Sequence, residues 1–404
     1  MTPLSKTHTR PEAIESAPGT YPCPGCDHRG LRVFHERHRV PIHSCRMVDT
    51  QQEAVAYPCR PLALGLCQVC GFISNVLFDP EVMHYDRHYE DRQGYSPRFR
   101  AYLNSLVEHL VARYDLRGRD ILEIGCGPGD FLRELCHAGR NRGIGIDPRC
   151  AAHAEGDLRF VGEPLRETHA ELPMDFVCCR HTLEHIPETG SFVRLLRRVI
   201  GDRMNTLVFF EVPDTSRILH ERAFWDVYYE HCSYFTQESL ATLFEGCGFD
   251  VVDASHAFDD QYLLLVARPV HELREPSPMG KADGARMVRQ ADAFAQDVEK
   301  AIRSWRERIE RWRQQGRRIA IWGAGSKCVA FLTGTGSADA IASVVDINPH
   351  HQGRFLPGIG HRIASPASLV RQKPDVVIVM NRIYHDEINE QLTEMGIPAR
   401  TFCV

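Results

Sequence analysis

The chain has 404 residues and a net charge of −5 at pH 7, with 43% hydrophobic and 25% charged residues. This length and ordinary globular composition indicate two or three domains, and the lack of a basic surplus argues against a nucleic acid polymer as a partner. No run of about 18 apolar residues occurs, so we expect no membrane span and, by default, a cytoplasmic protein.

Cysteines mark the first structured region. Residues 1–20 lack an apolar core and are expected to form a disordered lead-in, not a signal peptide. Two C-x-x-C pairs follow, Cys23 with Cys26 and Cys67 with Cys70. Four thiolates in two such pairs suit a closed tetrahedral Zn²⁺ site, so residues 21–84 are predicted to form a zinc-binding module with a structural metal.

Two alternatives for these cysteines stay open: thiols that bind no metal, and a redox C-x-x-C. The interval between the two pairs is long and also holds four further potential ligands, each of which could replace one of the four cysteines: His28, His43, Cys45 and Cys59.

A glycine-rich turn stands at the centre of the next region. An amphipathic helix is predicted at 101–114, and RGRDILEIGCGPGDFLREL at 117–135 predicts a strand, a glycine turn and a helix. The following strand, GIGID, ends at Asp147. This order of strand, glycine turn, helix, strand and acid is typical of the nucleotide-binding half of a doubly wound sheet.

The glycine turn favours one nucleotide ligand. It reads E-I-G-C-G-P-G, and it resembles motif I of class I S-adenosylmethionine-dependent methyltransferases more than a dinucleotide fingerprint. Glycines let the backbone approach the ligand, and the acid can accept both hydroxyls of a ribose. The resemblance implies that S-adenosylmethionine is bound by Glu123, Gly125, Cys126, Gly127, Gly129 and Asp147. A dehydrogenase and a βαβ unit without a ligand are the alternatives.

Strands and helices continue to alternate up to residue 269. They predict a seven-stranded methyltransferase sheet whose last strands are antiparallel, within an S-adenosylmethionine-dependent methyltransferase domain at 85–270. Residues 271–316 are expected to form a linker and a long charged helix, with the helix starting at 286.

A second glycine turn opens the last unit, 317–404, which is predicted to be a C-terminal Rossmann-like substrate-binding domain. The sequence RRIAIWGAGSKCVAFL gives a strand, the turn Gly323-x-Gly325 and a helix. A phosphate or nucleotide group could bind at the start of this helix with Lys327 as a contact, and Asn381 ends a later strand as a second candidate contact. The alternative is a packing domain without a ligand. The expected fold class is therefore α/β: a class I methyltransferase sheet flanked by a small zinc module and a Rossmann-like domain.

The order of these features resembles the sugar C-methyltransferases of antibiotic deoxysugar pathways. The family carries a Y-H-E-H-x-S-Y-F loop, matched here by YYEHCSYF at 228–235, and an N-V-L-x-H pattern, matched by HTLEH at 181–185. His181 stands where asparagine is usual. In the third unit, VVDINPHHQGRFLPG resembles V-V-D-x-N-P-x-K-Q-G-R-x-x-P-G, with His351 in the lysine position. The resemblance implies methylation of a nucleotide-linked 4-keto sugar at the carbon next to the ketone.

This reaction needs a base, a stabilised enolate and a methyl donor held in line. His231 is the predicted base, with Glu230 and Tyr228 orienting it or bonding the substrate. His185 and His181 are four residues apart, so a helix would place both imidazoles on one face, where they could stabilise the enolate. Tyr85 and Tyr89 are candidates to close over the site, as an N-terminal tyrosine does in the resembling family.

Other functions remain open at this stage. An O- or N-methyltransferase could use the same core on a different natural-product acceptor, and a non-catalytic zinc-bearing scaffold would carry a degenerate cofactor site. The expected partner is a small molecule, most simply a nucleotide-linked sugar. The sequence carries no indication of the oligomeric state.

Overall fold

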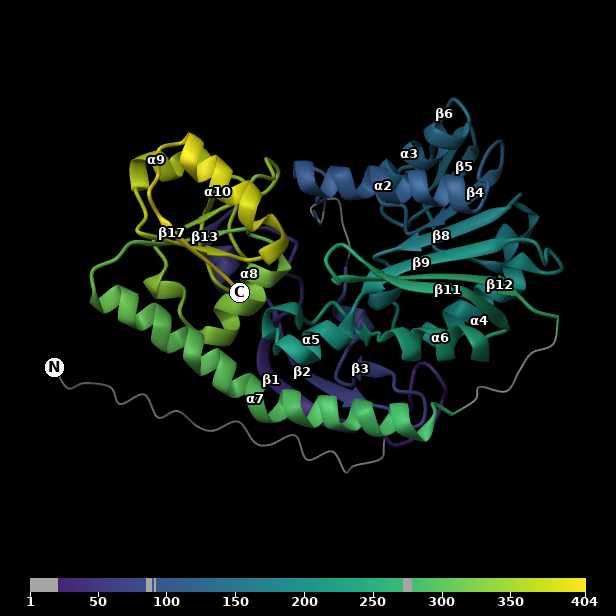
Figure 1. Ribbon diagram of the computed structural model, residues 1–404, viewed down its shortest axis with the longest axis horizontal. Helices are drawn as coiled ribbons and strands as arrows, with labels where there is room; N and C mark the ends of the chain where they lie inside the picture. Colours follow the sequence, from purple (N-terminus) through teal and green to yellow (C-terminus); the bar gives the residue numbers. More distant parts are fainter. Residues whose placement is uncertain (1–20, 85–88, 91, 272–277) are drawn as a thin grey trace.

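The computed structural model describes residues 21–84, 89–90, 92–271 and 278–404, in which the chain forms three sheets of four, eight and five strands (Figure 1). The predicted lead-in at 1–20 and the candidate Tyr85 lie outside the described residues. No helix in the described segments combines the length and apolar character needed to cross a bilayer.

The four-stranded sheet joins the cysteine-rich segment to a much later part of the chain. Its order is β1 (Arg32–Pro41), β2 (Cys59–Leu66), β3 (Ile73–Asn75) and β10 (Ser233–Tyr234), and a short helix, α1 (Gln51–Val55), connects β1 to β2. The strand β10 belongs to the aromatic loop that contains YYEH, and it pairs antiparallel with β3. This pairing attaches the loop to the N-terminal module.

The eight-stranded sheet has the topology expected of a class I methyltransferase. Its order is β11 (Phe249–Ala257), β12 (Tyr262–Pro269), β9 (Leu207–Pro213), β8 (Phe176–Arg180), β4 (Asp120–Ile124), β5 (Arg142–Ile146), β7 (Leu158–Val161) and β6 (His153–Glu155). The prediction that the last strands are antiparallel is confirmed, since β12 pairs antiparallel with both β9 and β11. The expected number of seven strands is exceeded by the short edge strand β6.

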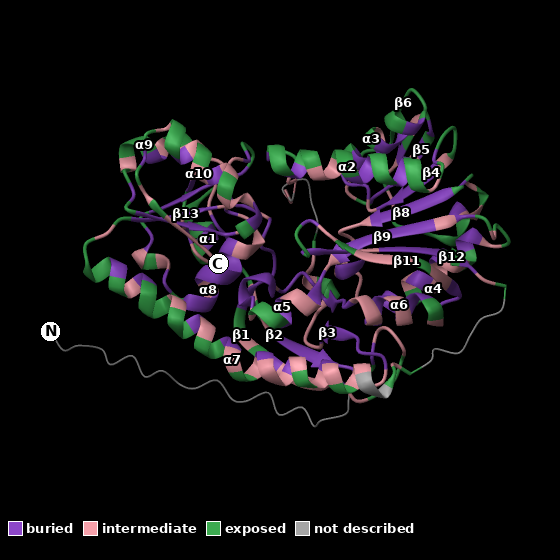
Figure 2. Cartoon of the chain, viewed as in Figure 1, coloured by how far each residue is buried: buried purple, intermediate pink, exposed green. Residues whose placement is uncertain are grey.

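Alternating side chains of the central strands fill two cores. In β4, Ile121 faces a core that includes α2 (Pro97–Arg113) and α3 (Asp130–Gly139), whereas Leu122 faces α4 (Thr189–Ile200) and α6 (Gln237–Gly246). This follows from the two-residue period of a strand. The helices therefore cover both faces of the sheet, and β8 and β9 are buried over almost their whole length (Figure 2).

The five-stranded sheet is parallel throughout, as in a Rossmann-like unit. Its order is β15 (Ile363–Ala364), β14 (Ser343–Val345), β13 (Ile319–Trp322), β16 (Val376–Val379) and β17 (Arg400–Cys403). The helices of this unit are α8 (Ser326–Thr335), α9 (Leu369–Gln372) and α10 (His385–Glu394).

One long helix connects the units. The helix α7 (Lys281–Gln314) starts five residues earlier than the expected position 286, and it runs along the N-terminal sheet to the C-terminal sheet (Figure 1). Its buried residues recur at helical spacing and share one hydrophobic cluster with residues of both sheets: Met287, Ala291, Phe294, Val298, Ile302 and Ile309. This cluster fixes the C-terminal sheet relative to the N-terminal one.

Candidate active site

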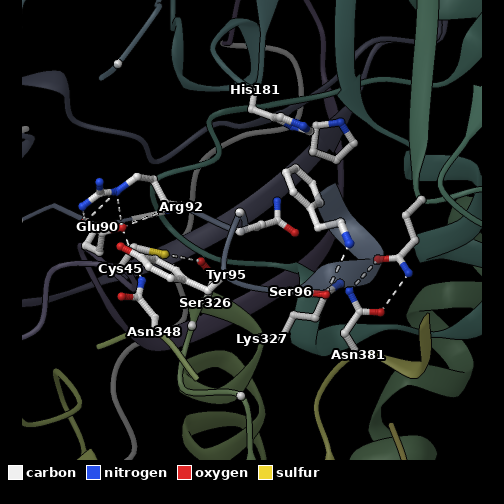
Figure 3. Close-up of a pocket in the computed structure, with 18 of the residues that line it drawn as sticks. Cys45, Glu90, Arg92, Tyr95, Ser96, His181, Ser326, Lys327, Asn348 and Asn381 are labelled. Carbon is white, nitrogen blue, oxygen red and sulfur yellow. Dashed lines mark hydrogen bonds and ion pairs between the residues drawn. The ribbon is translucent and has the colours of Figure 1, made fainter. Parts of the chain in front are cut away.

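A cavity of about 440 Å³ lies where the three sheets meet. Its walls come from distant parts of the chain, including Cys45 and Tyr89, the glycine turn after β4, the loop that contains His231, and the second glycine turn. In Figure 3, His181 lies on one side of this cavity, and Lys327 and Asn381 lie on the opposite side. The cavity is therefore bounded by both glycine turns.

The first glycine turn has the backbone shape that only glycine adopts readily. Gly125, Gly127 and Gly129 have φ values of 73°, 52° and 86°. A Cβ at Gly125 would lie 2.0 Å from Thr182 Oγ1, and a Cβ at Gly129 would lie 2.3 Å from the Phe160 ring. The turn therefore has no room for a side chain at Gly125 or Gly129.

The predicted cofactor residues gather at this turn. Glu123, Gly125, Cys126 and Gly127 line the cavity, whereas Gly129 and Asp147 lie beside it. Glu123 is 3% exposed, burial raises its pKa to about 8, and its Oε2 accepts no hydrogen bond from any described residue. An unsatisfied buried carboxyl oxygen beside a glycine turn that lines the cavity fits a ligand with hydrogen-bond donors, such as the amine and ribose of S-adenosylmethionine.

The aromatic loop after α5 (Thr215–Glu221) is anchored on both sides. Phe224 stacks on Phe331 of α8 with ring centroids 5.8 Å apart, and Phe235 contacts Phe72 at 5.4 Å. Tyr229 is fully buried, and its hydroxyl accepts a hydrogen bond from Asp79 N at 2.9 Å. These contacts hold the loop rigidly between the N-terminal and C-terminal sheets.

The loop presents His231 to the cavity. The His231 ring lies 4.2 Å from the Tyr228 ring and 4.8 Å from the His185 ring, measured between centroids. Burial lowers the pKa of His231 well below its ordinary value, and the neighbouring His185, His181 and Lys327 lower it further. The His231 imidazole is therefore neutral at physiological pH and able to accept a proton.

His185 and His181 line the same cavity, although no α-helix joins them. His185 ends a short 3-10 turn and donates from Nδ1 to the backbone carbonyl of Glu230 at 3.0 Å. His181 precedes that turn with φ of 48°. The helical arrangement expected from their spacing is wrong, because the backbone turns sharply after β8.

Glu230 does not line the cavity. It is 1% exposed, and its carboxylate accepts hydrogen bonds from the backbone N–H and the hydroxyl of Ser44. These hydrogen bonds join the loop to the N-terminal module, and the predicted role of Glu230 in orienting His231 or bonding the substrate stays a prediction. Tyr228, by contrast, packs directly on His231 and lines the cavity.

A buried ionic network supports His181. Glu211 is 0% exposed and accepts hydrogen bonds from Arg180 at 2.5 Å, from the Tyr102 hydroxyl at 3.0 Å and from His181 at 3.1 Å. Burial alone would lower the pKa of His181, but the Glu211 and Glu184 carboxylates outweigh it and raise the pKa to about 9. His181 therefore carries a positive charge in the cavity wall at neutral pH.

The candidates in the third unit, Lys327 and Asn381, both line the cavity. Lys327 pairs with an acid of the aromatic loop, and Asn381 pairs with the residue before β12. Lys327 Nζ contacts the carboxylate of Asp226, which also pairs with Arg217 at 2.6 Å. The Asn381 amide exchanges two hydrogen bonds with Gln261, at 2.8 and 3.0 Å. Tyr89 lines the cavity beneath the Arg149 guanidinium, 5.3 Å from its ring centroid.

The two C-x-x-C pairs come together in the N-terminal module. Their four Sγ atoms lie within 4.8 Å of one another, with Cys23 3.6 Å from Cys70 and Cys26 3.7 Å from Cys67. None of the cysteines forms a disulfide. Four thiol groups that converge in this way could hold a metal ion.

Three of the four further candidates for metal ligands have partners outside the four-cysteine cluster. The His43 ring bonds the Tyr57 hydroxyl, Cys59 Sγ donates to the backbone carbonyl of Tyr57, and Cys45 Sγ lies 2.9 Å from Ser326 Oγ in the cavity wall. His28 is exposed.

Comparison with known proteins identifies the reaction. Residues 95–254 match a methyltransferase domain family, and residues 268–403 match the family described as the C-methyltransferase C-terminal domain. Over 351 residues, which are 81% of this chain and 82% of the relative, the chain is 27% identical to the C-methyltransferase NovU of Streptomyces niveus. The chain is therefore a C-methyltransferase. It is an S-adenosylmethionine-dependent enzyme.

This C-methyltransferase also matches more distant proteins. A stretch of 95 residues is 30% identical to the ubiquinone biosynthesis O-methyltransferase of Sodalis glossinidius and covers 21% of this chain and 38% of that protein. The 1,6-didemethyltoxoflavin-N1-methyltransferase structure from Burkholderia thailandensis matches with 20% identity and a TM-score of 0.32, covering 42% of this chain and 79% of its own.

Several groups in or next to the cavity of the C-methyltransferase were missed by sequence reasoning. Glu211 and Asp226 are isolated acids within apolar segments, FFEVP and FWDV, and such acids are seldom buried unless they are paired. That signal could have marked both as members of an ionic network. The local sequence does not mark Arg180 and Arg217, the partners of these acids, or Ser44, the partner of Glu230. These pairs form only when the tertiary fold brings their segments together.

Proposed function

We propose that this C-methyltransferase methylates a nucleotide-linked 4-keto deoxysugar at the carbon next to the ketone, in the biosynthesis of a secondary metabolite such as an antibiotic. The observation that carries the proposal is the position of His231, a neutral buried imidazole on the wall of a cavity between two nucleotide-type glycine turns. One turn belongs to the methyl donor, and the other is available to the nucleotide of the acceptor.

The second turn is braced by an acid at the end of the next strand, as the first turn is. Asp346 at the end of β14 accepts hydrogen bonds from Ala324 N at 2.5 Å and from Asn348 N at 2.7 Å. A ten-residue helix, α8, begins directly after this turn and carries Lys327 in its first turn. A helix N-terminus with a lysine attracts a diphosphate, which supports a nucleotide-linked acceptor.

The chain supplies the base and the stabilisation of the enolate. His231 takes the proton from the carbon next to the ketone, the C–H electron pair becomes the enolate, and the enolate carbon then forms its new bond to the methyl group. When bound, S-adenosylmethionine supplies that electrophilic methyl group, and its sulfur keeps the electrons of the broken bond. The positively charged His181 and the neighbouring His185 lie across the cavity wall, where they can stabilise the enolate oxygen.

We propose that the four cysteines hold a structural Zn²⁺ ion. Zn–S bonds of about 2.3 Å in a tetrahedron place sulfurs about 3.8 Å apart. The distances of 3.6 and 3.7 Å agree with this geometry. The ion would stabilise the module to which β10 of the catalytic loop is attached. None of the cysteines is in a disulfide, as is usual in the reducing cytoplasm, to which we assign the protein.

Product analysis tests the proposal. The enzyme is incubated with methyl-labelled S-adenosylmethionine and a panel of nucleoside-diphosphate-linked 4-keto sugars, and the product is examined for a new carbon–methyl bond. Deuterium exchange from solvent at the carbon next to the ketone is followed in the wild-type protein and in His231→Ala. We expect both methylation and exchange in the wild type and neither in the variant. A methylated oxygen or nitrogen, or no acceptor despite binding of S-adenosylhomocysteine, would contradict the sugar assignment.

A further inference from the structure

One carboxylate of the cavity wall, Glu184, is surrounded by three imidazoles. Its Oε1 lies 3.7 Å from His181 Nδ1. One of its carboxylate oxygens also lies within 4.8 Å of ring nitrogens of both His185 and His231. Glu184 lines the cavity although it is only 2% exposed. A buried carboxylate is therefore within electrostatic range of the proposed base.

The backbone fixes this carboxylate relative to His231. Glu184 sits in the 3-10 turn Leu183–His185, and its carbonyl oxygen accepts a hydrogen bond of 3.0 Å from Cys232 N, the residue after His231. Its Oε2 is buried and accepts no hydrogen bond from the described residues. A buried acceptor of this kind is costly to leave unpaired, so it should gain a donor during the reaction.

His231 becomes such a donor when it takes a proton. The imidazolium would form in a buried place that already contains positive charge, and burial and positive neighbours both disfavour it. The ionisable groups around His231 come from four parts of the chain. Its own loop contributes Asp226, Tyr228 and Tyr234, and the segment after β8 contributes His181, Glu184 and His185. The N-terminal module contributes Cys45, and α8 contributes Lys327. Asp226 is already paired with Lys327 and Arg217. Glu184, by contrast, places a carboxylate oxygen within 4.8 Å of ring nitrogens of both His185 and His231.

We propose that Glu184 is a positioning residue for proton abstraction. Its carboxylate offsets the positive charge that His231 acquires and accepts a hydrogen bond from the imidazolium. This inference rests on the proposed function, because it assumes that His231 is the base. In the N-V-L-x-H pattern of the resembling family, Glu184 occupies the unspecified position, so the resemblance assigns it no role. The inference follows from the burial of Glu184 and its distances to the three histidines.

The test compares Glu184→Gln, which keeps the shape and removes the charge, with Glu188→Gln in the same segment. Glu188 is exposed and does not line the cavity. Two quantities are measured: the pH dependence of kcat/KM with a nucleoside-diphosphate-linked 4-keto sugar, and the titration of the His231 ring by NMR with S-adenosylhomocysteine bound. Glu184→Asp is included as the variant that retains the charge.

Removal of a negative charge lowers the pKa of a nearby imidazole, so in Glu184→Gln the acidic limb of the profile and the ring titration should both move to lower pH, by about 1–2 units. A weaker base is slower, so kcat should fall about 10–100-fold while the KM for S-adenosylmethionine is unchanged. Glu184→Asp should recover part of the rate, and Glu188→Gln should behave as the wild type.

An unshifted profile and an unshifted ring titration in a folded Glu184→Gln protein would overturn the inference, even if activity is reduced, because that pattern indicates only a structural role. A divalent cation bound to the wild type beyond the cysteine site and lost in Glu184→Gln would overturn it as well. If the wild type methylates no sugar, the proposed function fails, whereas the ring titration still decides whether Glu184 acts on His231.

Discussion

The Asp147 carboxylate accepts a hydrogen bond of 2.8 Å from the backbone N–H of Gly127, which ties the end of β5 to the glycine turn after β4. The other oxygen of Asp147 accepts from Arg149 N at 2.7 Å. Asp346 makes the same pair of contacts with Ala324 N and Asn348 N in the third unit. Two similar turns, each braced by an acid, thus face one cavity, and each can be tested separately.

The first glycine turn should not tolerate a methyl group. In Gly125→Ala, the added Cβ would meet the Thr182 side chain at 2.0 Å, and φ of 73° is unfavourable for alanine. We expect a loss of about 1–3 kcal/mol of unfolding free energy and at least a tenfold weaker affinity for S-adenosylhomocysteine, measured by calorimetry.

Gly118 provides the matched control for this change. Its φ is 64°, but no atom lies within 4 Å of a Cβ placed there. Gly118→Ala should therefore cost about 1 kcal/mol of stability from backbone strain and leave the affinity for S-adenosylhomocysteine unchanged. Equal affinities in Gly125→Ala and Gly118→Ala would mean that the turn does not hold the cofactor.

Local sequence patterns predicted the elements that have strong local signals. The strand at 120–124 and its glycine turn are explicit in the sequence, because an apolar run followed by closely spaced glycines has few other solutions. The strand β11, FDVVDASHA, was not predicted because its outward positions are polar and it has no continuous apolar run. The edge strand β6 is three exposed residues long and carries no signal.

Contacts between distant segments could not be predicted. His231 and Tyr228 could be selected from the composition of their loop, but β10 of that loop pairs with β3, more than 150 residues earlier, and this pairing is decided by tertiary packing. The same is true of Glu230. An acid next to the proposed base suggests catalysis, whereas its actual partner, Ser44, lies 186 residues away and became evident only in the fold.

The four-cysteine cluster should control the stability of the protein rather than the rate of methyl transfer. In Cys23→Ser, or after chelation of a bound Zn²⁺ ion, we expect a lower Tm, because the cluster joins the loop after residue 21 to the end of β2. Methyl transfer per folded molecule, measured well below the Tm, should be retained.

Cys59→Ser is the control, since this cysteine lies in the same module and its Sγ bonds only the Tyr57 carbonyl. Its metal content and Tm should match those of the wild type. A drop in rate at unchanged Tm on removal of the metal would show that the ion takes part in the reaction.

The pH dependence of stability should reveal the charge on His181. Its pKa is about 9, raised by Glu211 and Glu184 above the ordinary value of about 6.5. The stabilisation is therefore fully present below pH 6.5 and is lost as the pH rises through 9. It amounts to at most about 3 kcal/mol, reduced by the partial exposure of the ring.

Chemical denaturation of wild type and His181→Asn at several pH values measures this contribution. The difference in unfolding free energy between the two proteins should be largest near pH 6 and should disappear near pH 10. His220→Asn, at an exposed position, is the control for the removal of an imidazole. A His181→Asn difference that is constant across this range would mean that folding does not raise the pKa of His181.

Lys327 should determine affinity for the nucleotide. In Lys327→Met the side-chain volume is kept and the charge is removed, while Asp226 remains paired with Arg217 at 2.6 Å, so the protein should still fold. A charged hydrogen bond to phosphate contributes about 1.5–3 kcal/mol, which predicts about 10–100-fold weaker binding of a nucleoside diphosphate. Lys300→Met on the exposed face of α7 serves as the control for the change in net charge. Calorimetry with thymidine diphosphate measures both variants, and equal affinities would place the diphosphate away from the start of α8.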